Sequence, residues 1–97
     1  MHVLSRKALR DFWARVPEAE GALQAWFHEV SVAAWTSSAE VKARYGSASI
    51  ISAERVVFNI CGNKYRLVAR INYASSTLFV RFVGTHREYD RIDVETV

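Results

Sequence analysis

Two runs of alternating side chains, separated by Gly62-Asn63, limit the possible folds of this chain more than any other feature. Residues 55–60 and 64–73 alternate polar and apolar side chains with a period of two, which is typical of strands that bury one face. Glycine and asparagine both tolerate positive φ angles and therefore suit the turn of a hairpin. Residues 78–84 continue the alternation after a looser turn. These patterns predict a three-stranded antiparallel meander in the second half of the chain.

The first half of the chain has helical periodicity instead. Apolar residues recur at i, i+3, i+4 and i+7 across residues 9–16, and a similar stripe runs across residues 19–30. Pro17 lies between the two stripes, where it ends the first helix and can begin the second. The spacing of Ser37-Ser38-Ala39-Glu40 is that of a capping box and predicts a short third helix through about Ala43.

Together these patterns predict an α+β fold with a single domain over residues 1–97. Two N-terminal helices are expected to pack on one face of a mostly antiparallel sheet of three or four strands, with a short C-terminal helix beyond the sheet. Residues 1–4 could form a short strand or a loose terminus, and residues 45–52 are expected to form a loop. Half of the residues are hydrophobic, which is enough for one buried core.

The composition is that of a soluble globular protein and argues against several other classes. No apolar stretch approaches the roughly 20 residues of a membrane span, so we expect no membrane association. The N-terminal residues lack the apolar segment of a secretion signal. Cys61 is the only cysteine, which excludes an intramolecular disulfide and fits a reducing cytoplasm. His2, His28 and His86 are far apart and show no metal-ligand spacing, so we expect neither a metal ion nor another cofactor.

The excess positive charge lies in the second half of the chain. Residues 54–91 carry seven Lys and Arg against three Asp and Glu, whereas residues 1–53 carry six against five. Ten of the 13 basic residues are arginines, whose planar guanidinium suits bidentate contacts with phosphate. This distribution favours a phosphate-bearing partner. The alternative is an arginine-rich surface that serves only solubility.

Strand alternation places these cations on the sheet face away from the helices. Pairing about the predicted turn puts Asn59 opposite Arg66 and Arg55 opposite Arg70. The polar face is expected to carry Arg55, Lys64, Arg66, Arg70 and Arg81 with Phe79 and Val83, while Phe82 is expected to point toward the helices. Like charges side by side weaken a sheet, so this face predicts a bound polyanion. Alternatively, Glu54, Glu88 and Asp90 neutralise the cations internally.

The run over residues 82–90 predicts a strand that turns directly into a short capped helix. Thr85 and Glu88 have the S/T-x-x-E spacing of a capping box, so we expect Thr85 at the N-cap and His86 as the first helical residue. The imidazole, the phenol of Tyr89 and the carboxylate that follows would share one face. Histidine titrates near neutral pH and therefore suits proton transfer.

The two features are predicted to meet at one end of the sheet. The third strand would bring His86 next to Lys64 and Arg66. Metal-free cleavage of RNA needs one group to take a proton from the ribose 2′-hydroxyl and another to protonate the departing 5′-oxygen. It also needs cations that hold the phosphate while charge develops on it. This arrangement predicts an endoribonuclease.

Three segments carry a resemblance to a known family: Val57-Phe58-Asn59-Ile60, the run from Gly62 to Leu67, and the run from Arg81 to Asp90. They resemble the HigB family of toxins, part of the RelE/ParE-like superfamily of bacterial type II toxin–antitoxin systems. The resemblance implies a RelE-like fold. It also implies an mRNA interferase that cleaves mRNA on the ribosome, inhibits translation, and is held inactive by a helix-turn-helix antitoxin of the HigA-like kind.

The resemblance also implies roles for individual residues. His86 would act as general acid or base, and Arg66 and Arg81 would hold the phosphate. Lys64 and Tyr89 are further candidates for the catalytic site. The residues expected to hold RNA, either the message or the ribosome, are Arg55, Arg70, Arg87 and Arg91.

Two other functions stay open from the sequence. A ParE-like inhibitor of DNA gyrase would share the fold and cleave nothing. A non-catalytic RNA-binding or ribosome-binding module would use the arginine face alone, with binding that weakens as salt increases.

Overall fold

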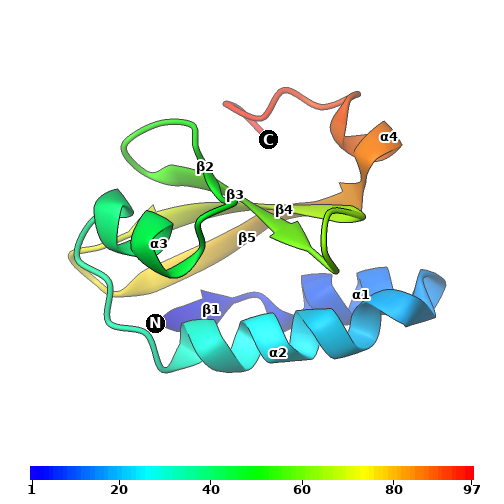
Figure 1. Cartoon of the computed structure of the whole chain (residues 1–97), viewed down its shortest axis with the longest axis horizontal. Coiled ribbons are helices and arrows are strands. Elements are labelled where there is room, and N and C mark those ends of the chain that lie inside the picture. Colours follow the sequence, from blue (N-terminus) through cyan, green and yellow to red (C-terminus); the bar gives the residue numbers. More distant parts are fainter.

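The computed structural model describes all 97 residues and has its two long N-terminal helices on one face of a mixed five-stranded sheet (Figure 1). The elements are β1 (His2–Leu4), α1 (Arg6–Arg15), a short 3-10 helix η1 (Pro17–Ala19), α2 (Glu20–Ser31), α3 (Ser38–Arg44), β2 (Ser49–Ile50), β3 (Arg55–Ile60), β4 (Tyr65–Asn72), β5 (Thr77–Thr85) and α4 (His86–Tyr89). The predicted α+β class and the two N-terminal helices are confirmed. The sheet has more strands than the expected three or four.

The additional strands lie at the two edges of the sheet, whose order is β1-β5-β4-β3-β2. Residues 2–4 form β1, which pairs in parallel with the start of β5, so the N-terminus is a strand and not a loose end. Ser49 and Ile50 form β2 against β3, where a loop was expected. All other pairs are antiparallel, as predicted.

The central hairpin has the predicted register, with Asn59 opposite Arg66. Its loop spans residues 61–64, and the positive φ angles occur at Cys61 (57°) and Gly62 (73°). The turn therefore forms at the predicted place, with positive φ at Gly62 and at the preceding cysteine, whereas Asn63 does not adopt this conformation. Lys64 N donates to Cys61 O at 3.3 Å, which closes the turn.

A β-bulge in β5 changes which side chains face the core. Ala69 pairs with Val80 and Val68 with Phe82, so Arg81 is the extra residue with no partner across the ladder. Because side chains alternate with a period of two, one extra residue reverses the faces beyond it. Val83 consequently packs against the core. The prediction for Phe82 and Val83 is therefore wrong, since their faces are exchanged.

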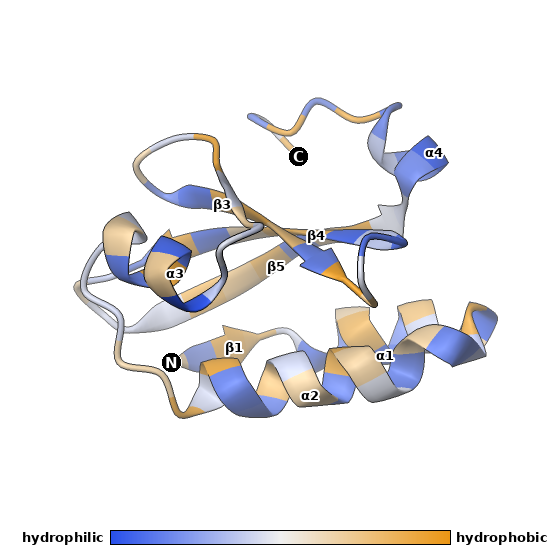
Figure 2. Cartoon of the chain, in the orientation of Figure 1, coloured by the Kyte–Doolittle hydropathy of each residue, from blue (hydrophilic) through white to orange (hydrophobic).

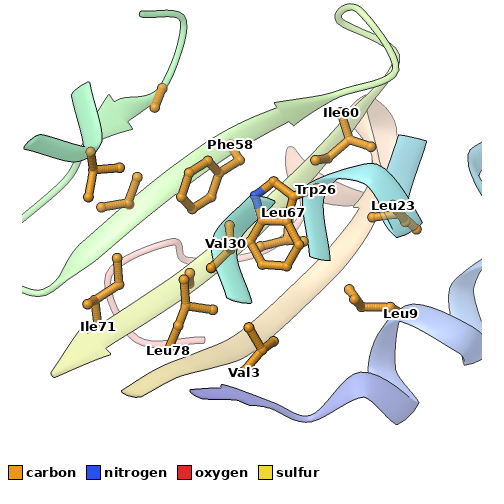
Figure 3. Close-up of a cluster of buried hydrophobic side chains, with 14 of the residues drawn as sticks. Val3, Leu9, Leu23, Trp26, Val30, Phe58, Ile60, Leu67, Ile71 and Leu78 are labelled. Atoms are coloured by element: carbon orange, nitrogen blue, oxygen red, sulfur yellow. The ribbon is translucent and has the colours of Figure 1, made fainter. Parts of the chain in front are cut away.

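The core lies between the helical layer and the sheet. Figure 3 shows Leu9 of α1 and Leu23 and Val30 of α2 pointing toward Phe58 and Leu67 on the strands, and all five are fully buried or nearly so. The polar sides of α1 and α2 face outward (Figure 2). This packing confirms the apolar stripes read from the sequence.

The two predicted N-terminal caps differ in detail. Ser37 Oγ accepts from Glu40 N at 3.4 Å and begins α3. The Glu40 carboxylate accepts from Thr36 N at 3.0 Å and does not bond Ser37 N, so this predicted capping box forms only in part. The box at the start of α4 forms completely.

The C-terminal segment, residues 90–97, runs over the sheet face opposite the helices (Figure 1). On this face Val57 is 3% exposed and Val68 is 0% exposed, although neither belongs to the main core. Arg55 Nη1 donates to the carbonyls of Val94 (3.3 Å) and Val97 (2.7 Å). The face predicted to be an open cationic surface is therefore partly covered. No helix of the chain is both long enough and apolar enough to cross a membrane.

Candidate functional site

The end of β5 and the start of α4 are held by reciprocal hydrogen bonds. Thr85 Oγ1 accepts from Glu88 N at 3.2 Å, and a Glu88 carboxylate oxygen accepts from Thr85 N at 2.9 Å. The predicted capping box and the position of His86 as first helical residue are confirmed. The Thr85 amide and the guanidinium of Arg15 lower the pKa of Glu88, because both stabilise the carboxylate.

Near the end of β5, the glycine at position 84 leaves room for two neighbouring side chains. A Cβ there would overlap the ring of Phe82 and lie 3.0 Å from Glu88 Oε1. Phe82 and Tyr89 have their ring centroids 6.4 Å apart, so the bulge that brings Phe82 to this face also gives α4 an aromatic support. Gly84 thus lets the strand, the ring and the cap meet closely.

His86 lies against the turn between β3 and β4, where its Nε2 contacts the carbonyl oxygen of Asn63. Arg66 Nη1 donates to the side-chain oxygen of Asn63 at 2.7 Å and also to that of Asn59. Arg66 Cζ lies 5.7 Å from the centroid of the Tyr89 ring, within cation–π range. We refer to His86, Arg66, Tyr89 and Asn63 as the His86 cluster. The expected juxtaposition of His86 and Arg66 is therefore observed.

Lys64 does not join this cluster. Its ammonium lies 3.7 Å from Glu18 Oε2, which belongs to η1 on the helical side of the sheet. Tyr65 donates to the same carboxylate, and this bond, with the lysine charge, lowers the pKa of Glu18. The same hydrogen bond raises the pKa of Tyr65 to about 12, because ionisation would remove the proton that the phenol donates to Glu18. Lys64 thus helps to hold the β3–β4 hairpin against the helical layer.

Arg81, expected to hold phosphate, turns toward the C-terminal segment. Its Nε donates to Val97 O at 3.2 Å, and its two terminal nitrogens have no protein partner. Arg55 also binds this segment. Arg55 and Arg81 both lie on the predicted sheet face. Along the strands, each is several residues away from the His86 cluster.

The remaining arginines divide into neutralised and free groups. Arg70 Nε donates to Glu54 at 3.0 Å and its guanidinium lies 5.8 Å from the Phe79 ring centroid, so internal neutralisation holds at this one position. Asp90 forms no ion pair. Two exposed arginines at the C-terminal end, Arg87 and Arg91, have no ionic partner either.

No three His, Cys, Asp or Glu side chains lie close enough together to hold a metal ion. The His86 cluster contains two side chains that can donate or accept a proton, the imidazole of His86 and the phenol of Tyr89. A guanidinium lies beside the phenol.

Residues 19–92 match the family model described as HigB_toxin, a RelE-like toxic component of a toxin–antitoxin system. The chain belongs to the HigB toxin family. As a HigB-family toxin it has the RelE-like fold that the resemblance implied, and it has an antitoxin as its partner.

Named relatives of this HigB-family toxin agree with that membership. The mRNA interferase toxin HigB of Escherichia coli strain K12 is 30% identical over 92 residues, which is 93% of this chain and 88% of the relative. The mRNA interferase HigB of Shigella flexneri shows the same identity and coverage. The mRNA interferase HigB of Escherichia coli O6:H1 is 21% identical over 94 residues, 95% of this chain and 91% of the relative.

Several contacts in and around the candidate site were missed from the sequence. Asn59 and Asn63 bind Arg66, and the predicted register already placed Asn59 opposite Arg66, so that one contact had a readable signal. The ion pair of Arg15 with Glu88 joins residues 73 positions apart and had no local signal.

Proposed function

We propose that this HigB-family toxin is an endoribonuclease that cleaves mRNA by acid–base chemistry at the His86 cluster, and so inhibits translation. The observation that carries the proposal is that Asn63 binds both His86 and the guanidinium of Arg66, which also lies against the ring of Tyr89. The relatives that match nearly the whole chain are named mRNA interferases. The proposal treats residues 1–97 as one toxin domain.

The proposed reaction is attack of the ribose 2′-oxygen on the adjacent phosphorus. A general base removes the proton of the 2′-hydroxyl, the new P–O bond closes a 2′,3′-cyclic phosphate, and the bond to the 5′-oxygen breaks. A general acid protonates that leaving oxygen, which gives a 5′-hydroxyl product. The balance needs no oxidant, reductant or metal ion.

His86 is proposed as one of the two proton-transfer groups. A carbonyl oxygen only accepts, so the contact with Asn63 keeps a proton on Nε2. The other ring nitrogen, Nδ1, is then the atom that exchanges a proton with the substrate, as base when the ring is neutral and as acid when it is charged. The phenol of Tyr89 is the second proton-transfer candidate.

Arg66 is proposed as the cation that holds the scissile phosphate. Its guanidinium is already oriented by two amide oxygens and the face of Tyr89, so little side-chain entropy is lost when phosphate binds. Such a preorganised charge stabilises the transition state, where negative charge builds on the phosphoryl oxygens.

The other cations are proposed to hold RNA on either side of the cluster. Arg81 keeps two terminal nitrogens for a phosphate, and Arg87 and Arg91 project from the end that follows β5. Arg55 and Arg70 would contribute from the opposite end of the face. Lys64 is proposed only as an RNA contact, because its charge is shared with Glu18.

Two partners belong to the proposal. One is the ribosome, with mRNA cleaved during translation in the cytoplasm, and the other is a HigA-like antitoxin of the helix-turn-helix type. Membership of the HigB toxin family supports the antitoxin, and the names of the relatives support the message as substrate. The same names disfavour inhibition of DNA gyrase.

Induced expression in bacteria tests the proposal, with mRNA 5′ ends mapped while growth is followed. The wild type and the control His28→Ala, an exposed helix residue, are expected to create new 5′ ends and arrest growth. His86→Ala is expected to do neither. Arrest with intact messages would remove the nuclease, and full cleavage by His86→Ala would remove His86 from the chemistry.

A further inference from the structure

Arg15 and Glu88 form an ion pair that joins the helical layer to the element carrying His86. Arg15 ends α1, and its Nη2 lies 3.0 Å from Glu88 Oε1 and 2.9 Å from Oε2. The helices α1 and α4 lie at the same end of the molecule (Figure 1). The bond therefore crosses from one layer of the fold to the other.

The arginine end of this ion pair rests on the core. Arg15 Cζ lies 4.8 Å from the ring centroid of Phe12, which is buried and in turn packs edge-on against Tyr65 at 5.4 Å. The aromatic ring limits the rotamers open to the guanidinium. The half-exposed Arg15 side chain is therefore held by two contacts, the ring of Phe12 and the carboxylate of Glu88.

The glutamate end of the ion pair is part of the cap of α4. The Glu88 carboxylate accepts from Thr85 N at 2.9 Å, one residue before His86. It also occupies the space above Gly84. A displacement of this carboxylate therefore displaces the backbone from which the imidazole projects.

The helix α4 has few other means of holding its position. It has four residues and no buried side chain, and it is hydrophilic along its length (Figure 2). A single helical turn of this kind is not stable by itself. Its orientation must come from the capping box, the contacts of Tyr89 with Phe82 and Arg66, the bond of His86 to the Asn63 carbonyl, and the ion pair.

We infer that Arg15 is a positioning residue for the proposed cleavage: through Glu88 it sets the orientation of α4 and hence of the His86 imidazole. The inference rests on the proposed function of His86. Arg15 itself touches no reacting atom in this scheme. Its own charge is matched by Glu88, which argues against a direct role in holding phosphate.

The test compares Arg15→Gln, Arg15→Lys and the control Arg10→Gln in single-turnover cleavage of mRNA on purified ribosomes. Arg10 is an exposed residue of the same helix with no ion pair. We expect Arg15→Gln to lower the rate at saturating toxin between about tenfold and a hundredfold, because a small misplacement of a reacting group has costs of this order. The toxin concentration at half-maximal rate should not change.

The other two variants sharpen the result. Arg15→Lys keeps a charge within reach of the carboxylate and should recover most of the rate, and Arg10→Gln should behave as wild type. A change confined to the half-maximal concentration would mean that Arg15 binds RNA and would overturn the inference. Equal effects of Arg15→Gln and Arg10→Gln on the rate would also overturn the inference, because the two variants share only the loss of one positive charge.

A second readout separates this inference from the proposed function. NMR of the free toxin should show that Arg15→Gln, but not Arg10→Gln, shifts the His86 ring and Thr85 amide signals and increases hydrogen exchange at Asp90 N, while the melting temperature stays close to that of wild type. Unchanged signals would overturn the inference even if mRNA is cleaved. Shifted signals in a toxin that cleaves no mRNA would overturn the proposed function and would leave standing only that Arg15 sets the orientation of α4.

Discussion

Nε2 of His86 faces the main-chain carbonyl of Asn63, so the proposed catalytic helix is attached to the hairpin turn that also carries a ligand of Arg66. Asn63 thus accepts a hydrogen bond from the His86 imidazole with its backbone carbonyl and one from the Arg66 guanidinium with its side chain. This arrangement couples the position of a proton-transfer group to that of the Arg66 guanidinium. It also distinguishes the two ring nitrogens.

We expect His86 to show a protected Nε2–H proton in its neutral form. The carbonyl of Asn63 accepts this proton, which should slow its exchange with water. Long-range ¹H–¹⁵N correlation spectra of the ring measure it. His28 is the internal comparison, since it makes no such bond, and its ring proton should exchange too fast to be seen. A neutral His86 protonated on Nδ1 would contradict the arrangement.

Gly84→Ala should destabilise the protein by about 1–3 kcal/mol, because the added methyl group overlaps Phe82 and crowds Glu88. Gly21→Ala is the matched control. A Cβ at Gly21 meets nothing within 4 Å, and the residue lies in α2, so this change should stabilise by about 0.5–1 kcal/mol. Urea unfolding of the two variants measures both effects. If both variants changed the free energy of unfolding in the same direction, the neighbours of Gly84 would be shown to move aside easily.

Arg66→Gln should lower single-turnover mRNA cleavage by about 10²-fold, the order observed when a preorganised group for transition-state charge is removed. Arg66→Lys should restore only part of the rate, because an ammonium cannot keep the fork held by Asn59 and Asn63. Arg70→Gln is the comparison on the same face: as a proposed RNA contact partly neutralised by Glu54, Arg70 should affect the toxin concentration at half-maximal rate and leave the rate at saturating toxin unchanged. Equal losses for Arg66→Gln and Arg70→Gln would indicate a diffuse electrostatic surface.

The stabilising effect of Glu88 should disappear in acid. Its pKa is lower in the folded chain than in the unfolded one, so the unfolded state binds more protons and stability rises with pH through this range. The contribution is present above the ordinary carboxyl pKa near 4.5 and is lost as pH falls through the lower folded value. Thermal unfolding from pH 6 to pH 2 should therefore show the wild type losing its advantage over Glu88→Gln. A constant difference across that range would contradict the lowered pKa.

Much of the fold could be predicted because its signals are local. The alternation over residues 55–60 and 64–73 identified the hairpin and its register, and the spacing of Thr85 and Glu88 identified the cap of α4. Residues 1–4 remained ambiguous, since a three-residue strand has no periodicity of its own. It forms because β5 offers a free edge in parallel orientation.

The faces of β5 could not be predicted in the same way. The extra residue at Arg81 depends on how β5 fits against β4 and the core, and it exchanges the directions of Phe82 and Val83. Alternation assumes an unbroken ladder, so it fails wherever a bulge occurs.

The sequence by itself determined the helices, the three strands of the meander, the hairpin register and the helix start that presents His86, because periodicity and capping depend on residues a few positions apart. Tertiary structure alone decided which partners the charged residues take. Lys64 pairs with Glu18, Arg81 with the carbonyl of Val97, and Arg15 with Glu88. The physical reason is that a long charged side chain can reach several partners, and only the packed backbone sets which carboxylate or carbonyl lies within about 3 Å of it.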